Sequence, residues 1–449
     1  MDNSRQATLE LGTKPVGKLL MQYALPAIAA MTAASLYNMT DSIFIGQGCG
    51  ALAISGLAIT FPLQNLGAAF GAGVGVGAST CISVKLGQKD YDTAERVFGN
   101  AFTLNLIIGV AFSIVTLLFL NPILRFFGAS DATLPYAREY MVVTLAGNVI
   151  SHMFFGMNAM LRAASKPRSA MMASIITVVL NAILSPIFIW PLHMGIRGAA
   201  LATIIAQAVV LAWQLRIFSN PQCIVHFKRG IYRPVARIIK NIVAIGMSPF
   251  SMNVCSCIVI IFINTALTRH GGDLAVGAFG ITNKIAFIFI MINMGMNQGM
   301  FPIAGYNYGA RNYQRLISVV KYTATVTVSI ATLGFVIAQV FPYECARLFT
   351  TDTTLIGISA HAIRVNMIAF PVVGLQMVCT GFFQSIGKAK VSMLLSLSRQ
   401  LLFFLPLLLV LPNFFQVDGV WWSQPISDAV SAVVAVTLLL KFMKKLKTK

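Results

Sequence analysis

Residues 97–124, VFGNAFTLNLIIGVAFSIVTLLFLNPIL, are mostly apolar and contain no Asp, Glu, Lys or Arg. A helix needs about 20 such residues to cross roughly 30 Å of hydrocarbon, so this stretch predicts a membrane-spanning helix. Its apolar residues do not alternate with polar ones, as they would in a strand of a membrane barrel. The stretch therefore indicates an α-helical membrane protein.

The composition of the whole chain agrees with this stretch. Of 449 residues, 57% are hydrophobic and 10% are charged, whereas soluble proteins carry roughly 25% charged residues. The first twenty residues contain no apolar core ahead of a cleavage site, so we expect the first apolar stretch to remain as a helix. The predicted spans are 18–46, 52–80, 97–124, 137–160, 169–192, 196–219, 238–268, 274–301, 316–343, 358–386, 392–412 and 418–441.

Lys and Arg are distributed unevenly between the two ends of these spans. The N-terminus, the tail and every second loop hold 26 of the 33 basic residues, and the other loops hold six. The basic loops are 81–96, 161–168, 216–240, 311–321 and 388–399. This bias predicts that both termini are cytoplasmic. Because the basic loops alternate with apolar spans, the formal charge of +20 indicates orientation in a membrane and no nucleic-acid partner is expected.

The second half of the chain repeats the first at a constant offset. The loop KLGQKDY (85–91) aligns with NYGARNY (307–313), and apolar composition does not explain a match between loops. Each copy holds six spans, an even number, so both copies face the same way and are expected to be related by a pseudo-twofold axis along the membrane normal. We therefore predict an all-α protein of twelve helices in two six-helix lobes. The predicted lobes are 1–219 and 241–449, with a cytoplasmic linker at 220–240.

Four segments resemble one family of transporters. They are LGTKPVGKLLMQYALPAIAAMTAASLYNMTDSIFIGQG (11–48), LGQKDYDTAERV (86–97), LRAASKPRSA (161–170) and VDGVWWSQPISD (417–428). In combination they resemble the MATE (multidrug and toxic compound extrusion) family, in particular its DinF-like bacterial multidrug branch. The resemblance implies a monomer in the bacterial inner membrane that exports structurally diverse, often cationic, drugs in exchange for H⁺ or Na⁺.

Other functions fit the sequence less well. A lipid-linked oligosaccharide flippase of the same superfamily is the alternative, and it would favour a strongly cationic cavity. Of the basic residues, Lys284 alone lies well inside a predicted span. No Walker motif, nucleophile elbow or metal-binding cluster occurs, so we expect neither an enzyme nor a cofactor beyond the coupling ion.

Asp41 is the first candidate for cation coupling. Of 13 acidic residues, only Asp41 and Asp428 lie clearly within predicted spans. Charge inside a membrane costs about 3 kcal/mol on insertion scales and usually marks function. The resemblance places the coupling site at Asp41 and Asn181. Tyr37 and Asn38 lie four and three residues before Asp41, on roughly the same helix face. The alternative is that Asp41 is simply hydrated at the outer helix end.

Further candidates follow from the same sequence. Some relatives carry a second carboxylate where this chain has Ser185, and its absence weakens a two-carboxylate mechanism. Pro26 favours a kink in the first helix, either fixed or linked to coupling. Lys284 is a candidate for coupling or for the substrate cavity. Three more side chains are either drug contacts or ordinary helix packing: Met291, Met294 and Gln298.

Two features have mainly structural interpretations. The small-residue run GAGVGVGAS (71–79) is expected to allow close helix packing. Asp428 is expected to support the last helix, and the alternative is that it couples transport.

Overall fold

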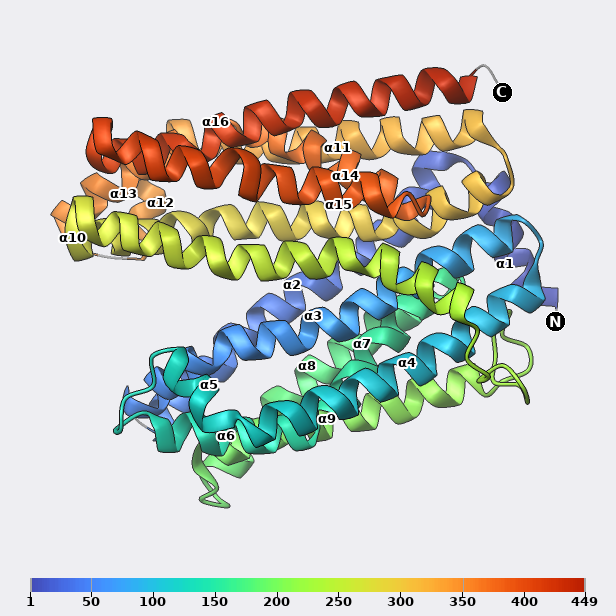
Figure 1. Ribbon diagram of the computed structural model, residues 1–449, viewed down its shortest axis with the longest axis horizontal. Coiled ribbons are helices and arrows are strands. Elements are labelled where there is room, and N and C mark those ends of the chain that lie inside the picture. The colour runs from blue at the N-terminus through green and yellow to red at the C-terminus, as the bar shows by residue number, and fades with distance from the viewer. Residues whose placement is uncertain (1, 50, 350, 448–449) are drawn as a thin grey trace. The chain divides into compact units, whose positions relative to one another are not determined.

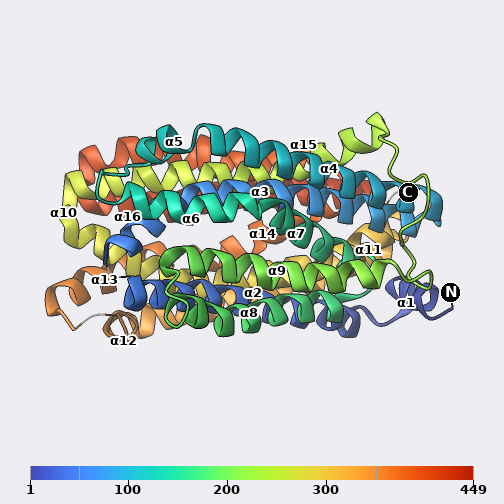
Figure 2. The same cartoon turned by 90° about the horizontal axis from the view of Figure 1, so that it is seen from below.

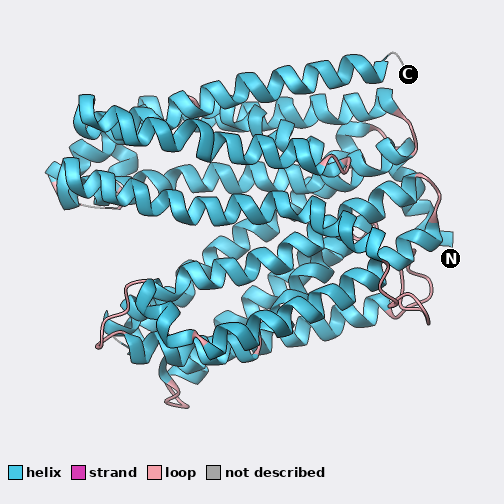
Figure 3. Cartoon of the chain, in the orientation of Figure 1, coloured by secondary structure: helices cyan, strands magenta, loops and turns pink. Residues whose placement is uncertain are grey.

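The computed structural model describes residues 2–49, 51–349 and 351–447 (Figure 1). Within them it describes all side chains except those at 2–5, 7, 34, 36–43, 46–47, 51–52, 54–55, 58, 273 and 447. These described residues form helices and connecting loops, with no strand among them (Figure 3).

The helices follow one another with short connections. In chain order they are α1 (Asp2–Thr13), α2 (Val16–Cys49), α3 (Ala51–Gly87), α4 (Tyr91–Leu118), α5 (Leu120–Phe126), α6 (Leu134–Ala146), α7 (Asn148–Ala163), α8 (Pro167–Ile189), α9 (Gly195–Phe218), α10 (Ala236–Gly309), α11 (Tyr313–Val340), α12 (Pro342–Arg347), α13 (Thr353–Asn366), α14 (Phe370–Ser385), α15 (Ala389–Leu397), the π-helix η1 (Ser398–Phe404) and α16 (Leu405–Lys447).

Ten stretches of the described residues are long and apolar enough to cross a membrane, when α6 with α7 and α13 with α14 are each counted as one bent span. One of the ten, Ala389–Leu446, contains a reversal at Gln416, where φ is 50°. Residues on either side of the reversal meet, since an added Cβ at Gly419 would lie 2.4 Å from the carbonyl oxygen of Leu411. This stretch therefore holds two spans, and α2, with 34 residues, adds the twelfth. The predicted all-α, twelve-helix fold is confirmed.

The chain divides into two compact units, and helices α2 and α10 contribute to both. Unit 1 comprises Met1–Thr13 and Ala29–Phe250, and unit 2 comprises Lys14–Ile28 and Ser251–Lys449. The boundaries after Ile28 and after Phe250 are separated by the same interval as the two copies of the sequence repeat. In each half, the start of the first long helix therefore belongs to the unit that the other half of the sequence mainly forms.

The segment between α9 and α10 belongs to unit 1. Asn100 of α4 donates from Nδ2 to the carbonyl oxygens of Ile231 and Arg233, at 3.3 and 3.1 Å. Its Oδ1 accepts a hydrogen bond from the backbone N–H of Val235, at 2.8 Å. Because one buried side chain fixes three backbone groups, the end of the predicted linker is held on unit 1.

The sequence repeat is also visible in the backbone. Lys89 and Arg311, which align with each other in the repeat, both have positive φ, of 60° and 58°. The next residues, Asp90 and Asn312, each cap the following helix with a side-chain oxygen. The bends between α6 and α7 and between α13 and α14 are 57° and 51°. Each half thus builds the same loop, cap and bend from different residues.

Glycines in the two units allow helices to approach closely at equivalent positions. In unit 1, an added Cβ at Gly77 would lie 2.1 Å from the carbonyl oxygen of Ile242. In unit 2, one at Gly299 would lie 2.6 Å from the Cα of Ala24. Lipid tails are as apolar as the side chains, so helices in a membrane associate through such close packing. The packing role predicted for residues 71–79 is confirmed.

We predict that Gly299→Ala lowers the stability of the folded protein by about 1–3 kcal/mol, because the new methyl group overlaps the backbone of α2. The thermal unfolding midpoint of purified protein in detergent measures this loss. Gly280→Ala is the matched control, since an added Cβ there meets nothing within 4 Å. Equal midpoints for the two variants would contradict the close contact.

Candidate functional site

A buried polar cluster joins α8 and α9 inside unit 1. The two helices lie side by side (Figures 1 and 2). Asn181 of α8 is 2% exposed, and its Nδ2 donates to Oγ1 of Thr203 on α9 at 2.9 Å. Ser185, one turn further along α8, donates to Oδ1 of Asn181 at 3.0 Å. The amide of Asn181 is therefore held at both of its polar atoms.

This cluster brings neutral oxygen atoms together within apolar spans. Amide and hydroxyl oxygens are ligands for hard cations and hydrogen-bond partners for a carboxyl group. Two of the three residues have the i, i+4 spacing that places side chains on one helix face. The sequence identified Asn181 as a candidate, but it did not identify Thr203. A single threonine in an apolar helix is too common to stand out.

The remaining predicted coupling residues lie on α2. Tyr37, Asn38 and Asp41 belong to the helical backbone of Val16–Cys49. Their side chains lie outside the described residues, so the predicted contacts among them stay predictions.

Pro26 lies in the part of α2 that belongs to unit 2, two residues before the boundary at Ile28. The helix continues through it from Val16 to Cys49. Its neighbours Ala24 and Ile28 pack against Gly299 and Gly295 of α10. Pro26 thus lies within a tightly packed stretch, and its predicted link to coupling stays a prediction.

The predicted drug-contact residues lie on the second half of α10. Met291, Met294 and Gln298 are each partly buried. Asn293 and Asn297 of the same helix are buried at 1% and 6% exposure. The structure therefore gives α10 a face of buried amides and, at different helix positions, a partly buried methionine face.

Lys284 is exposed, and its Nζ lies 5.6 Å from the centre of the Phe349 ring. A cation over an aromatic face is a favourable contact. No described carboxylate forms an ion pair with this amine. Its predicted part in coupling or substrate binding stays a prediction.

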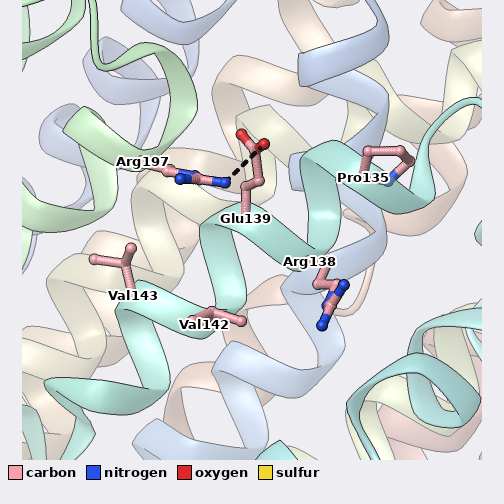
Figure 4. A pocket seen from close by; sticks show the side chains of 6 residues that line it. All are labelled: Pro135, Arg138, Glu139, Val142, Val143 and Arg197. Carbon is pink, nitrogen blue, oxygen red and sulfur yellow. Dashed lines mark hydrogen bonds and ion pairs between the residues drawn. The ribbon is translucent and has the colours of Figure 1, made fainter.

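A separate pocket of about 420 Å³ lies at the N-terminal ends of α6 and α9 (Figure 4). Arg197 of α9 forms an ion pair with Glu139 of α6 at 3.0 Å, and Arg138 points away from that pair. Pro135, Val142 and Val143 complete the lining. These side chains come from the first three turns of α6 and the first turn of α9.

Asp428 of α16 forms an ion pair with Arg399 of η1. Its Oδ1 lies 3.2 Å from Nη1 of Arg399, and both side chains are largely buried. The charge count groups Arg399 with the basic loop 388–399, but in the structure its side chain is largely buried within unit 2. Among the described residues, no three His, Cys, Asp or Glu side chains are grouped as metal ligands would be.

Comparison with known proteins decides the family. The family model MatE matches residues 26–187 and 246–410, most of the chain. The chain belongs to the MATE family. As a member of that family with apolar helices throughout, it is a multi-pass membrane protein.

Relatives of this MATE protein match over nearly its whole length. The multidrug export protein MepA of Staphylococcus haemolyticus is 27% identical over 429 residues, which cover 96% of this chain and 94% of MepA. Two crystal structures, of MATE in the straight and in the bent conformation, each have a TM-score of 0.92 and 26% identity. They cover 98% and 100% of this chain, and 99% of each of their own chains.

For this MATE protein we predict that Thr203→Val lowers stability by about 1–3 kcal/mol, because the buried amide of Asn181 loses its acceptor. Thr177→Val is the control, since the Thr177 hydroxyl bonds only to a carbonyl of its own helix, that of Ala173. Unfolding midpoints in detergent measure both variants. If they destabilise the protein equally, Asn181 does not depend on Thr203.

Proposed function

We propose that this protein is an antiporter of the bacterial inner membrane that exports structurally diverse, often cationic, drugs in exchange for H⁺ or Na⁺. The names of its relatives, multidrug export proteins with coverage above 90% of both chains, support drug export. The distribution of Lys and Arg supports cytoplasmic termini.

The packing of α2 on α8 supports a coupling site within unit 1. Gly48 of α2 contacts Ile189 and Trp190 at the end of α8. The two helices cross the membrane in the same direction, as the first and fifth spans. Counting back seven residues from Gly48 reaches Asp41, and counting back eight from Ile189 reaches Asn181. At 1.5 Å per residue, both positions lie about 10–12 Å below the contact, at similar depth.

The proposed mechanism assigns charge and geometry to different residues. Asp41 supplies the negative charge that a proton or Na⁺ neutralises. Asn181, held in one orientation by Thr203 and Ser185, supplies a fixed polar side chain beside the cation. Cation binding from outside and drug binding from inside then favour different conformations, which is the requirement for exchange.

The flippase alternative is less well supported. A pyrophosphate-linked lipid needs several cationic side chains in one cavity. Lys284 lies against Phe349, and the charge of Arg399 is neutralised by Asp428. Among the described residues, these two side chains therefore do not form a cluster of positive charge in the middle of the spans.

We predict that Asp41→Asn lowers gradient-driven ethidium efflux from reconstituted vesicles by at least about tenfold, because the amide cannot exchange a cation. Ethidium binding in the absence of a gradient should persist. Asp131→Asn is the matched control, since that carboxylate is 90% exposed and pairs with Arg125 at the end of α5. Efflux by Asp41→Asn at the wild-type rate would remove Asp41 from the mechanism.

A further inference from the structure

A largely buried ion pair, Arg399 with Asp428, lies within unit 2 between two neighbouring spans. Arg399 lies ten residues after the start of α15, and Asp428 lies twelve residues after the reversal at Gln416. At 1.5 Å per residue, both lie about 15–18 Å along their helices from these two points, which is about half of a hydrocarbon core of roughly 30 Å. Ionisable residues at that depth are rare and usually serve transport.

The carboxylate of Asp428 is enclosed by donors. Arg399 Nη1 lies 3.2 Å from Oδ1, and the amide nitrogen of Gln424 lies 3.1 Å from each oxygen. The Asp428 side chain is 5% exposed and that of Arg399 is 19% exposed. The carboxylate is thus almost fully buried, and its charge is balanced only while Arg399 stays beside it.

The backbone around the pair departs from regular helix on both sides. Arg399 belongs to η1, and π-helical turns often occur at functional sites. Its carbonyl oxygen accepts a hydrogen bond from the hydroxyl of Ser427 at 2.8 Å. On the facing helix, Pro425 removes one backbone donor from α16. In both helices the regular pattern of backbone hydrogen bonds is therefore already interrupted beside the pair, which makes a local rearrangement of the backbone less costly.

No other charged side chain among the described residues forms an ion pair with Asp428. The described titratable residues on the elements packed around this site are Tyr313, Arg315, Lys321 and Tyr322 on α11, His361 and Arg364 on α13, Cys379 on α14, Lys390 on α15, Asp418, Lys441, Lys444 and Lys445 on α16, and Arg237, Lys240, Cys255, Cys257, Arg269, His270, Lys284, Tyr306 and Tyr308 on α10. His361 pairs with Asp418, and Arg364 lies over Tyr343. Among the described residues, Arg399 is the one basic side chain that forms an ion pair with Asp428.

We propose that Asp428 is a second proton-binding carboxylate of the transport cycle, located in unit 2 and controlled by Arg399. The inference rests on the proposed cation-coupled export. When Oδ1 of Asp428 takes up a proton from water, its hydrogen bond from Arg399 breaks and the guanidinium loses its counter-charge. Arg399 then has to move, and η1 provides the backbone freedom for that movement. Proton release restores the pair.

The chemistry of the site selects a proton over Na⁺. A sodium ion bound to Asp428 would lie beside the guanidinium of Arg399, and Gln424 presents its donor nitrogen rather than its oxygen. A proton binds to one oxygen and needs no further ligands. The site therefore adds a proton step whether Asp41 exchanges H⁺ or Na⁺.

The decisive variant is the double substitution Arg399→Gln with Asp428→Asn, which removes both charges and leaves no buried ion alone. It is compared with wild type and with Arg125→Gln plus Asp131→Asn, which removes an exposed ion pair at the end of α5. Vesicles containing pyranine report proton entry while ethidium efflux is recorded between pH 5.5 and 8. We expect fewer protons per ethidium, by about half if each unit binds one, and a flatter pH profile.

Two results would overturn the proposal. A folded double variant with the wild-type proton count and pH profile would make the pair a structural bridge only. If the double variant does not fold, Asp428→Glu keeps the charge but moves the carboxylate, and an unchanged pH profile would then count against proton binding. Failure of the proposed function looks different, since wild-type protein itself would then export ethidium without any gradient.

Discussion

Close approach of helix backbones at small residues is the constraint on which both units depend. In unit 1, Gly73 and Gly77 of α3 meet the start of α10, and in unit 2, Gly295 and Gly299 of α10 meet the start of α2. The two pairs of glycines align with each other in the sequence repeat, as do the two unit boundaries. The same contact, built twice, attaches the first part of each long helix to the unit that its own half of the sequence does not supply.

The absence of water inside a membrane also determines how polar side chains within the spans are paired. Each buried donor or acceptor costs free energy unless a partner satisfies it, and in apolar surroundings the partner has to come from the protein. Asn181 is satisfied by Thr203 and Ser185, and the carboxylate of Asp428 by Arg399 and Gln424. One cluster is neutral and the other is ionised, so the two units place different chemistry inside similar helices.

Much of the fold could be predicted from the sequence because its signals are long. Apolar runs indicated the twelve spans, and matched loops such as 85–91 and 307–313 indicated the repeat. The residues of the candidate site were harder to predict from the sequence. Arg399 was counted with loop residues because it follows Lys388 and Lys390, and a charge count does not show where a span begins. Thr203 produced no signal, since its role depends on Asn181 across a helix pair.

The central claim, cation-coupled export, is tested most directly by ethidium efflux from vesicles containing the purified wild-type protein, with pH and Na⁺ gradients imposed separately. We predict efflux against an ethidium gradient when one of the two cation gradients is present, and loss of that efflux when it is collapsed. Ethidium flux that is the same with either gradient or with none would contradict antiport and indicate a channel.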